Sequence, residues 1–152
     1  MRRSLSLPTA NPDLAELLAV LDEYGPMCEA MFLMMAADRH MRNAERAVLR
    51  GALDVLSNGR VRTYHMEAML DASARRLADE GEAARRAHVI RALKQEPAMA
   101  EPTLVLAAAV ALADDQVVAE ESAWYRQLAE GLGVGQDRAE AILTSLTQPP
   151  EG

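Results

Sequence analysis

Acidic residues gather in two similar segments, and their spacing is the feature of this chain most suited to chemistry. The segment ADRHMRNAE spans residues 37–45, and the segment ADDQVVAEE spans residues 113–121. The acids concerned are Asp38 and Glu45 in the first segment, and Asp114, Asp115, Glu120 and Glu121 in the second. Hard cations such as Ca²⁺ and Mg²⁺ bind several carboxylate oxygens held on one loop. The second segment is therefore a candidate divalent-cation site, and the first, with fewer acids, is a weaker one.

A structural role for the same acids competes with cation binding. Asp38 and Asp114 each follow an apolar run, where a carboxylate can accept hydrogen bonds from the N–H groups of a helix–loop–helix corner. Glu45 and Glu121 fall where the next helix should begin, and the helix dipole stabilises an acid there. The spacing is not that of an EF-hand, whose loop is longer and has a central Gly. We favour helix capping over a cation site, with a docking surface formed by the acids as a third hypothesis.

Residues that could act as nucleophiles or soft-metal ligands do not form a recognisable motif. Cys28 lies in an apolar run without a Cys-His signature, so a buried thiol is the expected role. The three histidines, His40, His65 and His88, lack the i, i+4 pairing of a metal site. The methionines at positions 27, 31, 34, 35 and 41 could bind a soft metal through sulfur, but their helical spacing favours core packing.

Catalysis is not expected from this sequence. It contains no glycine-rich phosphate loop, no nucleophile elbow and no metalloprotease motif. An enzyme would need a pocket that brings Cys28 or a histidine beside a carboxylate. Two basic pairs, Arg75-Arg76 and Arg85-Arg86, are surrounded by acids, so we interpret them as a solvated, salt-bridged face.

The sequence that must position these residues repeats itself. Residues 26–56 align without a gap with residues 102–132. The matched pairs include Pro26 and Pro102, Asp38 and Asp114, Glu45 and Glu121, Arg50 and Arg126, and Leu56 and Leu132. After a small difference in length, residues 62–70 align with residues 135–143. This pattern indicates an internal duplication and predicts two related helix–loop–helix halves.

Helical signals run along the chain. Asn11-Pro12-Asp13 should begin the first helix, and Gly25-Pro26 should end it and begin the second. The stretches 26–37 and 102–113 are apolar on nearly every side, as helices in the middle of a bundle are. An amphipathic helix should follow each of them. The first would present Val48, Ala52, Val55 and Leu56, and the second Trp124, Leu128 and Leu132.

Further helices complete the predicted fold. Thr63 is the expected N-cap of a helix whose apolar stripe contains Met66, Met69, Leu70 and Leu77. Gly81 separates it from a helix at 82–95, with Ala87, Ile90 and Leu93 facing inward. We therefore predict an all-α protein, a single compact bundle of about seven or eight helices. It would comprise an N-terminal arm at 1–10, a domain at 11–146 with repeats at 26–70 and 102–143, and a frayed tail at 147–152.

Composition and charge limit the range of functions that the chain could have. Hydrophobic residues make up 50% of the chain and aromatic residues only 3%, so the core must be built from Ala, Leu, Val and Met. A formal net charge of −7 disfavours nucleic-acid binding, which needs a basic surface. Residues 1–7 lack the apolar segment of a signal peptide, and the longest apolar run, at 104–113, is about half the length of a membrane span. We therefore expect a cytoplasmic protein without membrane insertion.

The Ala-Asp loops followed by Glu45 and Glu121 resemble those of the tellurite-resistance TerB-like family. That family is marked by an Ala-Asp-Gly loop with an acid opening the next helix, although this chain has Arg39 and Asp115 in place of the Gly. The resemblance extends from about residue 27 to residue 146. It implies an all-helical fold with pseudo-twofold symmetry, and loop acids that form a shared surface feature for binding a metal or a partner. Family members also occur attached to J-domain co-chaperones, and the resemblance implies no reaction.

The predicted function follows largely from this resemblance. We expect a non-catalytic, cytoplasmic TerB-like module that acts as an accessory or protein-interaction domain in a tellurite, metal or general stress response. One alternative is a divalent-metal-binding protein that uses the acidic second loop with Ca²⁺ or Mg²⁺. Another is a co-chaperone-type scaffold. We expect a protein partner, and a homodimer is one form that such an interaction could take.

Overall fold

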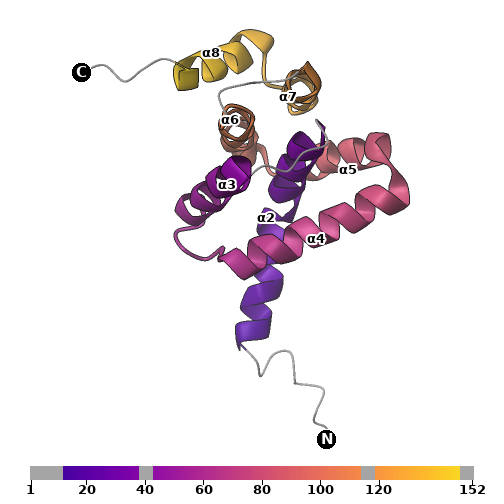
Figure 1. Ribbon diagram of the computed structural model, residues 1–152, viewed down its shortest axis with the longest axis vertical. Helices are drawn as coiled ribbons and strands as arrows, with labels where there is room; N and C mark the ends of the chain where they lie inside the picture. Colours follow the sequence, from indigo (N-terminus) through magenta and orange to yellow (C-terminus); the bar gives the residue numbers. More distant parts are fainter. Residues whose placement is uncertain (1–11, 38–42, 114–118, 148–152) are drawn as a thin grey trace, which may run out of the picture.

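A computed structural model describes residues 12–37, 43–113 and 119–147 of the chain (Figure 1). These residues form seven α-helices and one short 3₁₀ helix, and they include no β-strand. The elements are α2 (Pro12–Ala36), α3 (Asn43–Leu56), α4 (Thr63–Glu80), α5 (Glu82–Lys94), η2 (Pro97–Met99), α6 (Ala100–Ala111), α7 (Ala119–Gly131) and α8 (Gln136–Thr147). The prediction of an all-α protein is confirmed.

Helices α2 and α6 form the centre of the bundle. Helix α2 packs against α4, α5, α6 and α7, and α6 packs against α2, α3, α7 and α8. Their apolar runs are buried, as the sequence predicts, and include Met27, Met31, Met34 and Met35 in α2 and Leu104, Leu106, Ala107 and Val110 in α6. Figure 1 shows the N-terminal half of α2 extending beyond the other helices, with α3 and α5 on opposite sides of its C-terminal half.

The first helix does not end at Gly25-Pro26, as the sequence predicted, but continues through Pro26 to Ala36. A proline inside a helix cannot donate a hydrogen bond to the carbonyl four residues earlier, here that of Asp22, and it usually kinks or stops the helix. Asp22 is exposed, so water can bind this carbonyl. Packing of α2 against α4 and α5 stabilises the continuous helix and outweighs the local preference.

The inward face of α5 also differs from the predicted face. Ala87 is exposed and Ile90 is only half-buried, whereas Arg85, Val89 and Leu93 are buried one helical turn apart. Of the predicted residues, Leu93 is buried and Ile90 packs against the core, so the prediction is wrong only for Ala87. It also missed Arg85, which it placed on a solvated face. The ion pair that Arg85 makes, described below, is what allows this residue to be buried.

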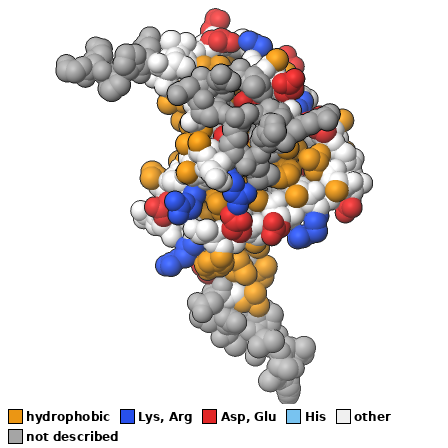
Figure 2. Space-filling model, in the orientation of Figure 1, with side chains coloured by type: hydrophobic (Ala, Val, Ile, Leu, Met, Phe, Trp, Pro, Cys, Tyr) orange, Lys and Arg blue, Asp and Glu red, His pale blue; other side chains and the backbone are white. Residues whose placement is uncertain are grey.

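The surface in Figure 2 carries mixed charges, with acidic and basic side chains interspersed across the middle of the molecule. Apolar side chains gather on the protruding part of α2 in the same view. Leu18 belongs to that part of α2 and is exposed. Within the described ranges, no helix combines the length and the apolar character needed to cross a membrane.

Candidate functional site

The acids that the sequence singled out are only partly within the described ranges. Asp38, Asp114 and Asp115 lie outside them. Glu120 is exposed in the first turn of α7, whereas its neighbour Glu121 is buried. No group of three His, Cys, Asp or Glu residues among those described could hold a metal ion. The cation site at the second loop therefore stays a prediction.

Glu45 and Glu121 are buried rather than exposed. Each lies in the first turn of its helix, α3 or α7, and each is only 1% exposed. Both residues take part in interactions within the protein. The expectation that the acids opening these helices form a surface feature is wrong for these two residues. Their position agrees with the structural interpretation, because the positive end of the helix dipole stabilises a carboxylate in the first turn.

Cys28 is buried in α2 and is a free cysteine. Burial raises the pKa of its thiol to about 12, and the neighbouring charge of Glu29 adds to this effect. The thiolate is the nucleophilic form of cysteine, and at neutral pH almost none of it would be present. The expectation of a buried thiol is confirmed.

His65 is buried in the first turn of α4, where its side chain caps the N-terminus of the helix. Its Nδ1 atom accepts a hydrogen bond of 2.9 Å from the backbone N–H of Arg62, which is the N-cap residue in place of the predicted Thr63. The imidazole must be neutral to accept this bond. Burial lowers the pKa of His65 from its ordinary value of 6.5, and the positive charge of Arg62 lowers it further, against an opposing effect of Glu16.

We predict that this histidine makes stability depend on pH. Because the pKa of His65 is lower in the folded chain than in the unfolded one, the unfolded chain binds more protons as the pH falls below the ordinary value of 6.5. The free energy of unfolding should therefore fall between pH 7 and pH 5. Thermal melts across this range should show a smaller fall in Tm for His65→Gln than for the wild type. An equal fall in both proteins would contradict the prediction.

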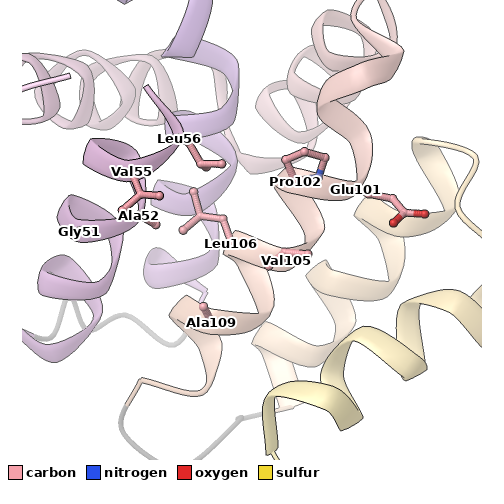
Figure 3. Close-up of a pocket in the computed structure, with 9 residues that line it drawn as sticks. All are labelled: Gly51, Ala52, Val55, Leu56, Glu101, Pro102, Val105, Leu106 and Ala109. Carbon is pink, nitrogen blue, oxygen red and sulfur yellow. The ribbon is translucent and has the colours of Figure 1, made fainter. Parts of the chain in front are cut away.

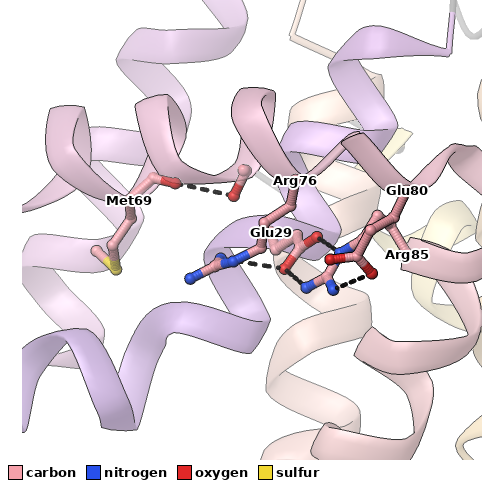
Figure 4. A network of polar contacts seen from close by, with 6 residues as sticks. Glu29, Met69, Arg76, Glu80 and Arg85 are labelled. Atoms are coloured by element: carbon pink, nitrogen blue, oxygen red, sulfur yellow. Dashed lines mark hydrogen bonds and ion pairs between the residues drawn. The ribbon is translucent and has the colours of Figure 1, made fainter. Parts of the chain in front are cut away.

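A buried ion cluster connects α2, α4 and α5 (Figure 4). Glu29, in the apolar run of α2, is 2% exposed and accepts two hydrogen bonds from Arg85 of α5, from Nε at 2.7 Å and from Nη2 at 2.8 Å. Arg76 of α4 lies 3.5 Å from the same carboxylate. Arg85 also donates to Glu80 at 3.0 Å, and these hydrogen bonds raise the pKa of Arg85.

The interpretation of the basic pairs as a solvated, salt-bridged face is confirmed for the salt bridges of Arg76, Arg85 and Arg86, but Arg85 is not solvated. Arg75 and Arg76 are exposed, but Arg85 is buried. A buried charge requires a partner, and Glu29 supplies one in a geometry with two parallel bonds. The sequence did carry a signal, because Glu29 is an acid within a run that is otherwise apolar. It carried no indication of which arginine, far away along the chain, would pair with it.

Arg86 connects α5 to α7. Its Nη1 atom donates to Gln127 at 3.0 Å, and its guanidinium group lies 4.9 Å from the centre of the Trp124 ring. Trp124 is completely buried, and its Nε1–H donates to the carbonyl of Ala30 in α2 at 3.0 Å. Arg85 and Arg86 therefore hold α5 over the surface that α2 and α7 form together.

The pocket beside the ion cluster is not well suited to binding a substrate anion. It has a volume of about 480 Å³ and is lined by Glu29, Arg76, Arg85 and His88, among others. Arg76 and Arg85 both contact the carboxylate of Glu29, and Arg85 also pairs with Glu80, so two carboxylates balance the two positive charges. This charge distribution indicates a structural role for the cluster.

An apolar groove between α3 and α6 has no counterpart in the predictions (Figure 3). It encloses about 610 Å³ and is lined by Gly51, Ala52, Val55, Leu56, Glu101, Pro102, Val105, Leu106 and Ala109. Figure 3 shows Leu106 of α6 directed toward α3, and the side chain of Glu101 directed away from it. Val55, Leu56 and Val105 are 78%, 43% and 41% exposed. The groove thus presents branched apolar side chains from both helices to solvent.

The groove offers no free charge among its lining residues. Glu101 accepts hydrogen bonds of 3.2 and 2.8 Å from Arg138 of α8, and these lower the pKa of Glu101. The sequence predicted an amphipathic helix with the apolar residues Val48, Ala52, Val55 and Leu56. Val48 and Ala52 pack against the core, whereas Val55 and Leu56 are exposed. The buried residues Leu49 and Leu53 were not named in that prediction. The sequence did contain a sign of the groove. The apolar residues of α3 extend around more of the helix than a single buried face requires.

Comparisons with known proteins do not assign this site. No family model, no curated protein and no solved structure matches the chain. A functional assignment therefore has to come from the groove, the ion cluster and the buried acids themselves. Of these, the groove presents apolar side chains to solvent, whereas Glu29 and Arg85 of the ion cluster and the acids Glu45 and Glu121 are buried.

Proposed function

We propose that this chain is a non-catalytic, cytoplasmic interaction module that binds a protein partner in the α3/α6 groove. The observation that carries the proposal is the exposure of Val55, Leu56 and Val105 around one hollow. Soluble proteins seldom leave such side chains exposed together unless another surface covers them. The volume of about 610 Å³ is also typical of a binding pocket.

The chemistry of the groove favours a protein partner over a small polar metabolite. Orientation of a small metabolite usually depends on a few polar groups that converge in the pocket. Here the one charged lining residue, Glu101, is bonded to Arg138 and points away from α3. Apolar side chains that lie on two helices are instead the usual centre of a protein–protein contact. The burial of the Cys28 thiol and its raised pKa support a role without catalysis.

We further propose that the chain is TerB-like and consists of two related halves. The support comes from where the helices begin. Helices α3 and α7 begin at Asn43 and Ala119, which the first alignment pairs, and α4 and α8 begin at Thr63 and Gln136, which the second alignment pairs. The paired acids of the first turns of α3 and α7 are both buried. The role that the resemblance implies is that of an accessory domain in a tellurite, metal or general stress response.

Site-specific crosslinking tests the groove as the binding site. A photo-reactive amino acid at position 55 or 105 should capture the same partner in cells that produce the chain. The matched controls are positions 64 and 146, where Tyr64 and Leu146 are also exposed apolar residues but lie outside the groove. A second substitution, Val55→Glu, should abolish capture from position 105. It should change the free energy of unfolding by less than about 0.5 kcal/mol, because Val55 is exposed.

The same experiment can reject the proposal. If positions 64 and 146 capture the partner as efficiently as positions 55 and 105, the contact is not made in the groove. If capture from position 105 persists in Val55→Glu, the apolar character of the groove is irrelevant to binding.

A further inference from the structure

We propose that the partner enters the α3/α6 groove as a basic amphipathic α-helix, and that it lies over α6 and α3 as α5 lies over α2 and α7. This inference rests on the proposed function and on the proposed relation between the halves. It goes beyond both, because it specifies what kind of segment binds and how its contact face is composed.

Helix α5 already covers one such surface. It lies against α2, and Arg85 pairs with Glu29 of that helix. On the other side, Arg86 bonds to Gln127 of α7. Ile90 lies so close to Gly131 of α7 that a Cβ atom at residue 131 would be 2.7 Å from the Cγ2 atom of Ile90. The α2/α7 surface is thus a groove that is already filled by a helix of the same chain.

The alignment of residues 26–56 with residues 102–132 relates this filled surface to the open groove. The corresponding positions are Glu29 and Val105, Gln127 and Gly51, and Gly131 and Val55. All three positions on α2 and α7 contact α5, and all three positions on α3 and α6 line the groove. The two surfaces are therefore built from matching positions, and one of them lacks a covering helix among the described elements.

Burial differs between the two surfaces in the way that a missing helix would produce. Trp124 and Leu128 of α7 are completely buried, whereas the matching residues of α3, Val48 and Ala52, are only half-buried. Glu29 is 2% exposed, whereas the matching Val105 is 41% exposed. A helix laid across α3 and α6 would bury these residues as α5 buries their counterparts.

The substitutions between the surfaces define the contact face of the partner. Val105 stands in place of Glu29, so the partner needs an apolar residue where α5 has Arg85. Gly51 stands in place of Gln127, and no atom lies within 4 Å of a Cβ placed there, so a large side chain fits above it. Val55 stands in place of Gly131 and requires a smaller residue than Ile90 in that position.

The negative net charge of the chain favours basic residues on the outer side of the partner helix. The described lining of the groove has no charge that could pair with the contact face, because Glu101 is already bonded to Arg138. The chain as a whole carries a formal charge of −7, which attracts a cationic segment from a distance. Helix α5 also has cations on its outer side, since Arg91 and Lys94 are exposed, whereas Arg85 is buried against α2.

A peptide display experiment with the full chain as bait tests the inference. The probe is a library of random peptides about 20 residues long, which is enough for several helical turns. We expect the selected peptides to carry apolar residues at i, i+3 or i+4, and i+7, with Lys and Arg at the remaining positions. Val105→Glu and Val55→Glu should each weaken their binding by at least about tenfold. Tyr64→Glu, at an exposed position outside the groove, should not weaken it.

The outcomes separate this inference from the proposed function. Peptides that depend on the groove but have an extended or proline-rich pattern would overturn the helix and leave the groove as a binding site. Failure to select any groove-dependent peptide would overturn both. Dimerisation of the chain that Val55→Glu abolishes, measured by analytical ultracentrifugation, would assign the groove to a second copy and overturn the helical partner.

A change of specificity tests the relation between the two surfaces. The triple variant Gly51→Gln, Val55→Gly, Val105→Glu recreates the three α5-contacting positions in the open groove. A labelled peptide of residues 82–95 should bind this variant at least about tenfold more tightly than it binds the wild type. Equal binding to both proteins would show that the two surfaces do not correspond, and it would overturn the inference.

Discussion

Arg85→Met should lower the free energy of unfolding by about 3–5 kcal/mol, because it leaves the carboxylate of Glu29 buried without its main partner. Glu29 is 2% exposed, and Arg76, the remaining cation, lies 3.5 Å away and is itself exposed. A buried carboxylate without good hydrogen bonds is costly, and water has little access to this position. Denaturation by urea, followed by circular dichroism, measures the loss.

Two matched variants distinguish the loss of the ion pair from a general effect on α5. Arg91→Met removes an exposed cation from the same helix and should cost less than about 0.5 kcal/mol. The double variant Glu29→Leu, Arg85→Met removes both charges and should recover most of the stability, because apolar residues can replace a buried ion pair at little cost. If the double variant is no more stable than Arg85→Met, the carboxylate of Glu29 is not the source of the loss.

The general fold was predictable from the sequence because the strongest signals were local. The apolar runs of α2 and α6 are long, aromatic residues are few, and each run has a helix in the structure. The stripe formed by Met66, Met69 and Leu70 is buried as predicted. Such patterns arise from the helical repeat of 3.6 residues, which each segment carries independently of its neighbours.

The errors in the prediction have a common origin in tertiary contacts. Pro26 should end a helix by local criteria, but packing of α2 against α4 and α5 maintains it. Arg85 should be solvated because it is charged, but the ion pair with Glu29 allows it to be buried. These outcomes depend on which helix lies beside which, and local preferences do not contain that information.

The groove was missed for the same reason. Val55 and Leu56 are apolar residues on an amphipathic helix, and a local interpretation assigns them to the core. Whether they are buried depends on a further helix that covers α3 and α6, as α5 covers α2 and α7. The sequence does contain the relevant comparison, because the duplication pairs Val105 with Glu29. That pairing indicates an uncovered surface on α3 and α6 only when the contacts of α5 with Glu29 are known.

The second large effect should come from Trp124, which lies at the centre of the surface that α5 covers. It is completely buried, donates to the carbonyl of Ala30 at 3.0 Å, and has the guanidinium group of Arg86 4.9 Å from its ring centre. Trp124→Ala should lower the free energy of unfolding by about 3–5 kcal/mol, because it removes a large buried side chain and leaves a cavity between α2, α5 and α7.

Two further variants resolve the origin of this effect. Trp124→Phe keeps most of the ring but removes the N–H donor, so it should cost only about 1–2 kcal/mol. Tyr64→Ala, at an exposed aromatic residue, should cost less than about 0.5 kcal/mol. Because the chain has a single tryptophan, circular dichroism must follow unfolding in the variants that lack it. A loss in Trp124→Ala as small as that in Tyr64→Ala would mean that α5 does not depend on Trp124. It would also mean that the contacts of α5 with α2 and α7 contribute little to stability. The α2/α7 surface could then not serve as a model for how a helix binds in the α3/α6 groove.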